Sequence, residues 1–168
     1  MGFTELSGRT SPTELVEILN TIFSEFDQLA ELHGLEKIKT VGDAYMVVGG
    51  VPMARDDHAE AIAEMAIDIQ ASITQFHLQT GEPLSIRIGI HTGPVVAGVI
   101  GIKKFTYDLW GDTVNIASRM ESHGIAGEIQ ISETTYQKLQ GKYVFQERGL
   151  IPIKGKGEMR TYLLRIKN

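Results

Sequence analysis

The sequence predicts a protein of the α+β class with a mixed, mostly antiparallel sheet. Two patterns favour this class: predicted helices and strands interleave along the chain, and several neighbouring strands are joined by short hairpins rather than by helical crossovers. The length of 168 residues suits one domain with a real hydrophobic core. We therefore expect a single domain over 1–168.

The first elements predicted are a truncated strand and a long helix. Met1-Gly2-Phe3-Thr4 resembles the end of a strand whose earlier part is absent, so we expect the N-terminal strand to be cut. Ser11, Pro12 and Glu14 then form a helix start, because Ser suits the N-cap, Pro the first turn and Glu the capping box. Apolar residues at helical spacing continue this helix until Gly34 ends it.

A β-hairpin is predicted over 36–50, where β-branched and aromatic residues flank a Gly42-Asp43 turn. The turn presents the Asp43 carboxylate at the hairpin tip. A carboxylate there suits a hard cation such as Mg²⁺, although an Asp in a turn more often only stabilises the turn. Strict alternation along the first strand predicts that Lys39 shares a face with Lys37 and Val41.

The remaining elements follow from the same patterns. Asp56 and Asp57 favour the start of a second helix, whose apolar stripe continues to Phe76 before Gly81 and Pro83 stop it. Further strands are expected at 84–90, 95–100, 105–110, 128–131, 143–146, 150–154 and 160–166, with helices at 112–121 and 132–139. A cut strand, helix, hairpin, helix and strand in this order are compatible with a ferredoxin-like βαββαβ core with added C-terminal strands.

Composition excludes several classes of function. The net charge is −5 with no basic tract, so duplex nucleic acid is not an expected partner, whereas a single nucleotide needs only a local basic cluster. There is no cysteine, which excludes disulfides and thiolate metal sites and fits a reducing compartment. No apolar run reaches the length of a membrane span. We expect the chain to be cytoplasmic.

Several polar residues are candidates for chemistry. Asn115 and Arg119 are four apart on a predicted helix and share one face, so Arg could clamp phosphate while Asn fixes a hydroxyl or ring oxygen. An exposed polar face is the common alternative. The Lys154-Gly155-Lys156-Gly157 segment would let backbone approach an anion, but it is a weak motif alone. Asp108 is equally compatible with a surface loop, and His91 favours a structural role at a strand end.

Five segments together carry a family resemblance. They are Gly2-Phe3-Thr4, residues 39–46 (KTVGDAYM), residues 87–95 (RIGIHTGPV), residues 107–121 (YDLWGDTVNIASRME) and residues 154–157 (KGKG). In this order they resemble the class III nucleotide cyclase catalytic domain of the adenylate cyclase type. The match spans nearly the whole chain, and its combination is far more specific than any one segment.

The resemblance implies a head-to-tail homodimer that converts ATP to 3′,5′-cyclic AMP and pyrophosphate. It also implies two Mg²⁺ or Mn²⁺ ions per site, held by two aspartates. Asp43 matches the second aspartate. The first would lie two residues before Gly2, a position that precedes residue 1, so the chain by itself is expected to be catalytically impaired. Regulatory domains are expected elsewhere in a longer protein.

The resemblance also implies how the base is selected. Lys39 and Asp108 match the pair that contacts adenine in adenylate-making members, whereas guanylate-making members usually carry Glu and Cys or a small residue. The chemistry agrees, because Lys donates to adenine N1 and Asp accepts from the exocyclic amine. Guanine reverses both polarities at that edge.

The other substrate contacts are implied in the same way. Asn115 matches the residue that orients the ribose, and Arg119 matches the one that stabilises charge in the transition state. Lys154 matches the lysine that binds the triphosphate. Phe3 and Thr4 match the segment whose backbone meets the phosphates.

Three alternatives stay open at this point. The chain could be a non-catalytic, regulatory nucleotide-binding module, which the absent first aspartate favours and the intact Lys39, Asp108, Asn115 and Arg119 set disfavours. It could also be a guanylate cyclase. A diguanylate cyclase is a distant possibility, since the chain lacks a Gly-Gly-Asp-Glu-Phe hairpin.

Overall fold

The computed structural model describes residues 3–165, which fall into two compact units within Met1–Ile86 and Arg87–Asn168. The first unit contains α1 (Phe3–Ser7), α2 (Pro12–Leu32), β1 (Glu36–Val41), β2 (Ala44–Val48) and α3 (His58–Thr80). The second contains β3 (Ile88–Ile90), β4 (Val96–Ile100), β5 (Thr106–Trp110), α4 (Asp112–Ser122), β6 (Ile129–Ser132), α5 (Glu133–Leu139), β7 (Val144–Ile153) and β8 (Gly157–Arg165). The single domain over 1–168 stays a prediction.

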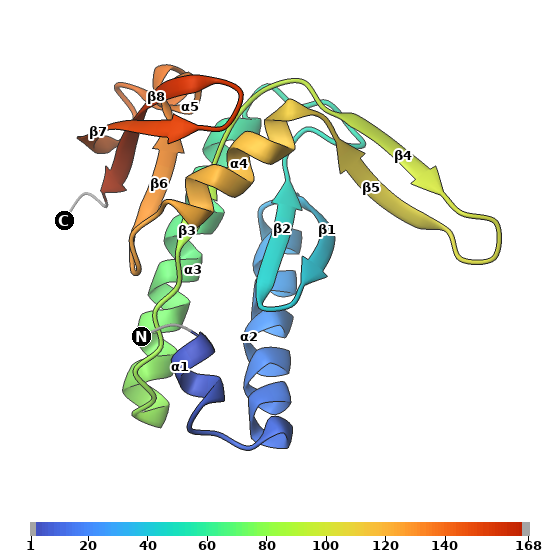
Figure 1. Ribbon diagram of the computed structural model, residues 1–168, viewed down its shortest axis with the longest axis vertical. Helices are drawn as coiled ribbons and strands as arrows, with labels where there is room; N and C mark the ends of the chain where they lie inside the picture. The colour runs from blue at the N-terminus through green and yellow to red at the C-terminus, as the bar shows by residue number, and fades with distance from the viewer. Residues whose placement is uncertain (1–2, 166–168) are drawn as a thin grey trace. The chain divides into compact units, whose positions relative to one another are not determined.

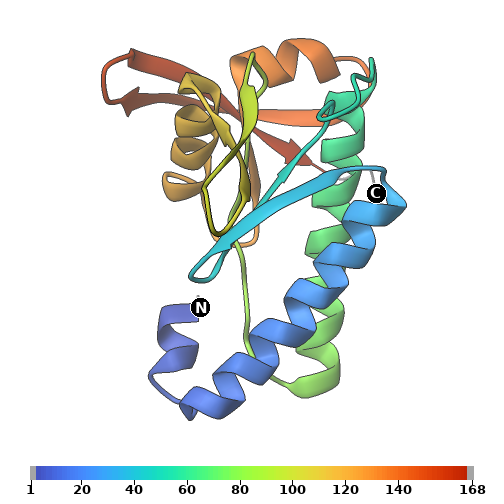
Figure 2. The same cartoon turned by 90° about the vertical axis from the view of Figure 1, so that its right-hand side faces the viewer.

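In the first unit, two long helices pack together and carry the β1–β2 hairpin. The predicted capping box at the start of α2 is confirmed, because the Ser11 hydroxyl accepts from the Glu14 amide and the Glu14 carboxylate accepts from the Ser11 amide. α2 and α3 run in opposite directions and contact each other (Figure 2). The hairpin contacts α2 through Tyr45, whose ring lies 5.5 Å from that of Phe26 and 5.7 Å from that of Phe23.

In the second unit, four strands form a mixed sheet in the order β3-β6-β8-β7. Only β3 and β6 are parallel, while β6–β8 and β8–β7 are antiparallel (Figure 1). α4 contacts β3 and β6, and α5 contacts β6 and β8. Ile116 and Met120 of α4 form a buried cluster with Ile151 and Ile153 of β7. This cluster orients the opposite face of α4 away from the core.

The β4–β5 hairpin is a separate antiparallel ribbon of the second unit. It extends away from the four-stranded sheet of that unit (Figure 1). Its apolar side chains are largely exposed, with relative exposures of 57% for Val99, 63% for Ile100, 95% for Ile102 and 76% for Phe105. Such a concentration of exposed apolar side chains is typical of an interaction surface.

The α+β class with a mixed, mostly antiparallel sheet is confirmed, and three element predictions need correction. The strand predicted at 84–90 is regular only over Ile88–Ile90, because Pro83 cannot donate to a ladder and Leu84 donates locally to the Glu82 carbonyl. The strands predicted at 143–146 and 150–154 are one strand, β7, which tolerates a bulge between Glu147 and Gly149.

The third correction concerns the N-terminus. Phe3 and Thr4 begin the short helix α1 rather than ending a strand. Met1 and Gly2 lie outside the described residues, as does the earlier part of the expected cut strand. Among residues 3–165, no helix has both the length and the apolar character required to cross a membrane.

Gly89 provides a direct test of how α4 is seated. A Cβ atom at this position would lie 2.1 Å from the Glu121 backbone nitrogen and 2.5 Å from the Met120 carbonyl carbon. Gly89→Ala should therefore force α4 away from β3 and lower the free energy of unfolding by at least about 2 kcal/mol. Urea denaturation with a circular dichroism readout measures this loss.

The matched control is Gly98→Ala in β4, where the added Cβ meets only the Trp110 ring at an ordinary 3.5 Å. This control should change stability by no more than about 0.5 kcal/mol. Equal stability of the two variants would contradict the close seating of α4 on β3.

Candidate active site

Asp43 lies where the sequence predicted it, at the exposed tip of the β1–β2 hairpin. The preceding Gly42 has a φ of 59°, a left-handed conformation that side chains rarely adopt, so glycine is required for this tight turn. The carboxylate is a hard oxygen donor of the kind that Mg²⁺ prefers. Within residues 3–165, no three His, Cys, Asp or Glu side chains gather to form a metal cluster. The role of Asp43 as a metal ligand stays a prediction.

The prediction that Lys39 shares a face with Lys37 is wrong. Lys37 pairs with Val47, but Lys39 pairs with Met46, so Ile38 is an extra residue in β1. Such a β-bulge breaks the alternation of faces. Lys37 therefore shares a face with Val47, and Lys39 shares the other face with Met46.

Lys37 is held by Asp27 of α2. Its Nζ lies 2.9 Å from the Asp27 Oδ1 and 5.3 Å from the centroid of the Tyr45 ring. The Tyr45 hydroxyl donates to the same Asp27 oxygen at 2.7 Å. One carboxylate thus contacts β1 through Lys37 and β2 through Tyr45.

The pKa values reflect this arrangement. Burial raises the pKa of Asp27, but hydrogen bonds from Lys37 and Tyr45, with the Lys37 charge, outweigh it and leave that pKa below its ordinary value. Burial raises the pKa of Tyr45, and the neighbouring Asp27 raises it further. Asp27 therefore stays ionised and Tyr45 stays protonated at neutral pH.

Asn115 and Arg119 both lie on the exposed face of α4, as predicted. The buried Ile116 and Met120 fix the opposite face on the sheet. The helix is also held at both ends. The Thr113 hydroxyl donates to the Pro94 carbonyl at 2.6 Å, and the buried Gln130 amide donates to the Met120 carbonyl at 3.0 Å. A rigid helix therefore presents the two polar side chains together.

Asp108 and Lys154 lie at two other places in the second unit. Asp108 is half-buried in β5, where its carboxylate accepts from the Leu109 amide at 2.8 Å. Lys154 is exposed in the turn between β7 and β8, which the Lys156 amide closes by donating to the Ile153 carbonyl at 2.9 Å. Gly155 has a φ of 79° in this turn, so the turn requires glycine there.

Sequence reasoning missed one contact beside this turn. The Lys156 ammonium lies 2.6 Å from the Asp112 carboxylate at the start of α4. The pair joins the turn that carries Lys154 to the helix that carries Asn115 and Arg119. No local pattern signals it, because its two members lie far apart in sequence and both are ordinary surface charges.

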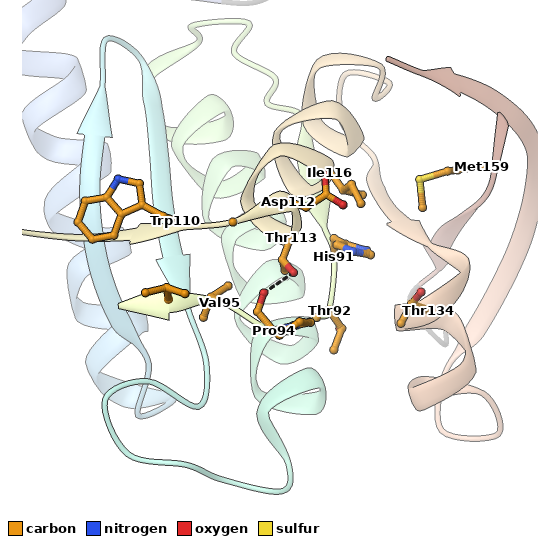
Figure 3. A pocket seen from close by; sticks show the side chains of 13 residues that line it. His91, Thr92, Pro94, Val95, Trp110, Asp112, Thr113, Ile116, Thr134 and Met159 are labelled. Carbon is orange, nitrogen blue, oxygen red and sulfur yellow. Dashed lines mark hydrogen bonds between the residues drawn. The ribbon is translucent and has the colours of Figure 1, made fainter. Parts of the chain in front are cut away.

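A hollow of about 530 Å³ lies beside the first turn of α4 (Figure 3). It is lined by His91, Asp112, Ile116 and Met159 among others, and by none of the predicted site residues. The His91 Nδ1 lies 2.6 Å from the Ser132 hydroxyl. Burial lowers the pKa of His91, and the Asp112 charge offsets this only in part. A neutral, hydrogen-bonded His91 fits the structural role favoured by the sequence.

The described residues thus give two separate sets of predicted site residues. Lys39 and Asp43 belong to the first unit, and Asp108, Asn115, Arg119 and Lys154 belong to the second. Phe3 and Thr4 begin α1, but their side chains lie outside the description. The position expected for the first metal aspartate precedes residue 1.

Residues 1–166 match the family model of the adenylate and guanylate cyclase catalytic domain. The chain belongs to this family. It is 50% identical over 164 residues to an adenylate cyclase of Mycobacterium tuberculosis, with 98% of this chain and 37% of that protein covered. It is 47% identical over 164 residues to the guanylate cyclase soluble subunit beta-2 of Rattus norvegicus, with 96% of this chain and 24% of that protein covered.

The guanylate cyclase domain of RhGC from Catenaria anguillulae, solved in complex with GTP, has a similar structure. Its TM-score is 0.92 at 45% identity, covering 99% of this chain and 91% of that chain. The predicted class III cyclase family is therefore confirmed. This cyclase domain spans well under half of the curated relatives above, and those relatives include both adenylate and guanylate cyclases.

The buried His91 gives a pH-dependent prediction. Folding lowers the pKa of His91, so the folded protein binds a proton at this imidazole less tightly than the unfolded chain does. The stability that His91 contributes is present above the ordinary histidine pKa of about 6.5 and is lost as the pH falls below that value. His91→Asn should reduce the loss of stability between pH 8 and pH 5.5, measured by urea denaturation.

A His91→Asn variant that loses as much stability as the parent would show that His91 does not titrate in this range.

Proposed function

We propose that this cyclase domain is an adenylate cyclase, which converts ATP to 3′,5′-cyclic AMP and pyrophosphate in a homodimer with two equivalent sites. The observation that carries the proposal is the identity of two residues, Lys39 and Asp108, which match the adenine-selecting positions of the family. A lysine and an aspartate at these positions present one donor and one acceptor to the base. Adenine offers the matching acceptor at N1 and donor at its amine, whereas guanine offers the reverse.

Burial strengthens this discrimination. Lys39 and Asp108 are both half-buried, so a base whose edge does not match them would cost about 1–3 kcal/mol for each mismatched contact. A site that satisfies adenine should therefore reject guanine, although the ring systems have the same size. The bulge at Ile38 supports the assignment, since it separates Lys39 from the face on which Asp27 holds Lys37.

The proposed reaction is an in-line displacement at the α-phosphorus. The ribose 3′-oxygen forms a bond to this phosphorus and loses its proton, while the bond to the β-phosphate oxygen breaks and pyrophosphate leaves. Asn115 would orient the ribose so that the 3′-oxygen faces the phosphorus. Arg119, four residues along the same exposed face, would stabilise the charge that develops on the phosphate oxygens.

The remaining residues would hold the leaving group and the metal. Lys154, on its glycine-containing turn, would bind the triphosphate, and the backbone at Phe3 and Thr4 would meet the phosphates. Asp43 would contribute a ligand to Mg²⁺ or Mn²⁺, two ions serving each site. When bound, such ions lower the pKa of the attacking hydroxyl and neutralise phosphate charge.

The exposed β4–β5 hairpin supports a dimer as the active form. Most of its apolar side chains are exposed, and contact with a second copy of the chain would remove them from water. In the head-to-tail arrangement expected from the family, Asp43 of one copy and Asn115 and Arg119 of the other would complete each site. Regulatory input would come from other parts of a longer protein, and a cytoplasmic location stays a proposal.

Base selection gives the direct test. The parent should favour ATP over GTP by at least about tenfold in kcat/KM. Lys39→Glu combined with Asp108→Cys should erase most of this preference, because the polarity of both contacts is removed or reversed. Total turnover is expected to fall, since the neighbouring residues remain those of the parent. Initial rates with both nucleotides, in protein extended by the strand expected before Gly2, measure the ratio.

Lys138→Glu is the matched control, because it reverses the charge of an exposed lysine on α5 that belongs to no predicted site. Its ratio should stay closer to that of the parent than the ratio of the double variant. A parent that already prefers GTP would refute the adenylate assignment and favour a guanylate cyclase.

Mixing two inactive variants tests the shared site. Asp43→Ala and Arg119→Ala should each abolish turnover alone, since every site in a homodimer then lacks one essential side chain. Mixed in equal amounts, half of the dimers are heterodimers with one intact site of two, so about a quarter of parental activity should return. Sedimentation confirms dimerisation, and Asp43→Ala mixed with itself is the control. Confirmed heterodimers without recovered activity would exclude a site shared in this way.

A further inference from the structure

The bulge at Ile38 is a feature that the proposed reaction does not by itself explain. Without it, regular pairing of β1 with β2 would continue from Lys39 opposite Met46 to Ile38 opposite Val47. Lys37 and Lys39 would then point to the same face, as strict alternation requires. The observed pairing of Lys37 with Val47 moves Lys37 to the face that also carries Tyr45.

Asp27 is placed to hold this irregular register. Its carboxylate contacts the Lys37 ammonium at 2.9 Å and the Tyr45 hydroxyl at 2.7 Å, so it links the bulged strand to its partner strand from outside the hairpin. Tyr45 is fixed in turn by its ring contacts with Phe23 and Phe26. If the Asp27 carboxylate were removed, Lys37 would lose its charged partner on this face.

Stability alone does not account for this cluster. The side chains of Lys37 and Asp27 are 39% and 47% exposed, and ion pairs with such exposure contribute little to folding. The same contacts lie on the face of the hairpin that carries both Lys37 and Tyr45. A bulge that re-aims a neighbouring side chain is a common device beside binding sites.

We propose that Asp27 is a positioning residue for base selection. By holding Lys37 and Tyr45 on one face of the hairpin, it maintains the bulge at Ile38 and keeps Lys37 off the opposite face, which carries Lys39. This inference rests on the proposed function, because it assigns Lys39 to the base. Asp27 itself does not contact the nucleotide in this proposal and acts only through the register of β1.

The experiment compares Asp27→Ala with Glu25→Ala, an exposed carboxylate two positions earlier on the same helix. Asp27→Ala should bring the ATP-to-GTP ratio of kcat/KM at least about fivefold closer to one, whereas Glu25→Ala should stay within about twofold of the parent. Equilibrium binding of non-cyclisable ATP and GTP analogues gives the same ratio without turnover. Nuclear Overhauser contacts should show Ile38, rather than Lys37, opposite Val47 in the Asp27→Ala protein.

Two milder variants distinguish a change in the register of β1 from a general folding defect. Tyr45→Phe removes only the hydroxyl contact, and Lys37→Met removes the charge while keeping the apolar stem. Tyr45→Phe should shift the ratio in the same direction as Asp27→Ala, whereas Lys37→Met should stay closer to the parent, because no second ammonium can then join Lys39 on its face. A folded Asp27→Ala protein whose ratio or strand register is unchanged would overturn the proposal, even if its melting temperature fell.

The outcome is separable from that of the proposed function. If the parent prefers GTP, the adenylate assignment fails, but Asp27 is still judged by whether its removal brings the binding ratio closer to one. If the parent prefers ATP and the ratio does not respond to Asp27, the adenylate assignment stands and the positioning role fails.

Discussion

The close contact between the backbones of α4 and β3 is the constraint on which the second unit depends. It exists because residue 89 has no side chain, so that the Glu121 backbone occupies the space that a Cβ would need. With the helix this close to the sheet, Ile116 and Met120 reach the core of β7, and no room remains for a polar residue on that face. Asn115 and Arg119 are consequently the side chains that face outward, and they are carried by an element that cannot rotate without opening the core.

The first unit orients its candidate side chains by a different device. The β1–β2 hairpin has few buried contacts of its own, and a two-stranded ribbon is only marginally stable by itself. Its geometry is therefore imposed by α2, through the rings of Phe23 and Phe26 and the carboxylate of Asp27. Tertiary contacts of this kind can maintain a bulge that local strand propensity would not produce.

This difference explains what the sequence could and could not predict. The capping box of α2, the Gly42 turn and the left-handed Gly81 after α3 follow from local chemistry, and all three are present. The face of Lys39 was mispredicted, because alternation assumes an unbroken ladder, whereas β1 has a bulge beside Lys37, which contacts Asp27 ten residues earlier in the chain.

Long-range contacts account for the other differences. The length of β7 was missed because a glycine at position 149 indicates a strand break when only the sequence is read. In the structure Gly149 has a φ of 121°, and β8 pairs with β7 on both sides of it. The Asp112–Lys156 contact forms only when β7 and β8 bring their turn to the start of α4, so no spacing rule predicts it. The site residues themselves were placed by the family resemblance, since single polar residues on a strand or helix carry little information alone.

The choice between ATP and GTP shows why overall similarity settles the family but not the substrate. Identity of 50% to an adenylate cyclase and 47% to a guanylate cyclase subunit mostly measures a shared core, because packing constrains many more positions than base recognition does. In the proposed site, base recognition rests instead on two polar contacts, and at about 1–3 kcal/mol each they would be sufficient for a preference of tenfold or more. A lysine at position 39 would discriminate only if its ammonium reached the base edge. The register of β1 would matter as well, because it decides whether Lys37 shares the face of Lys39.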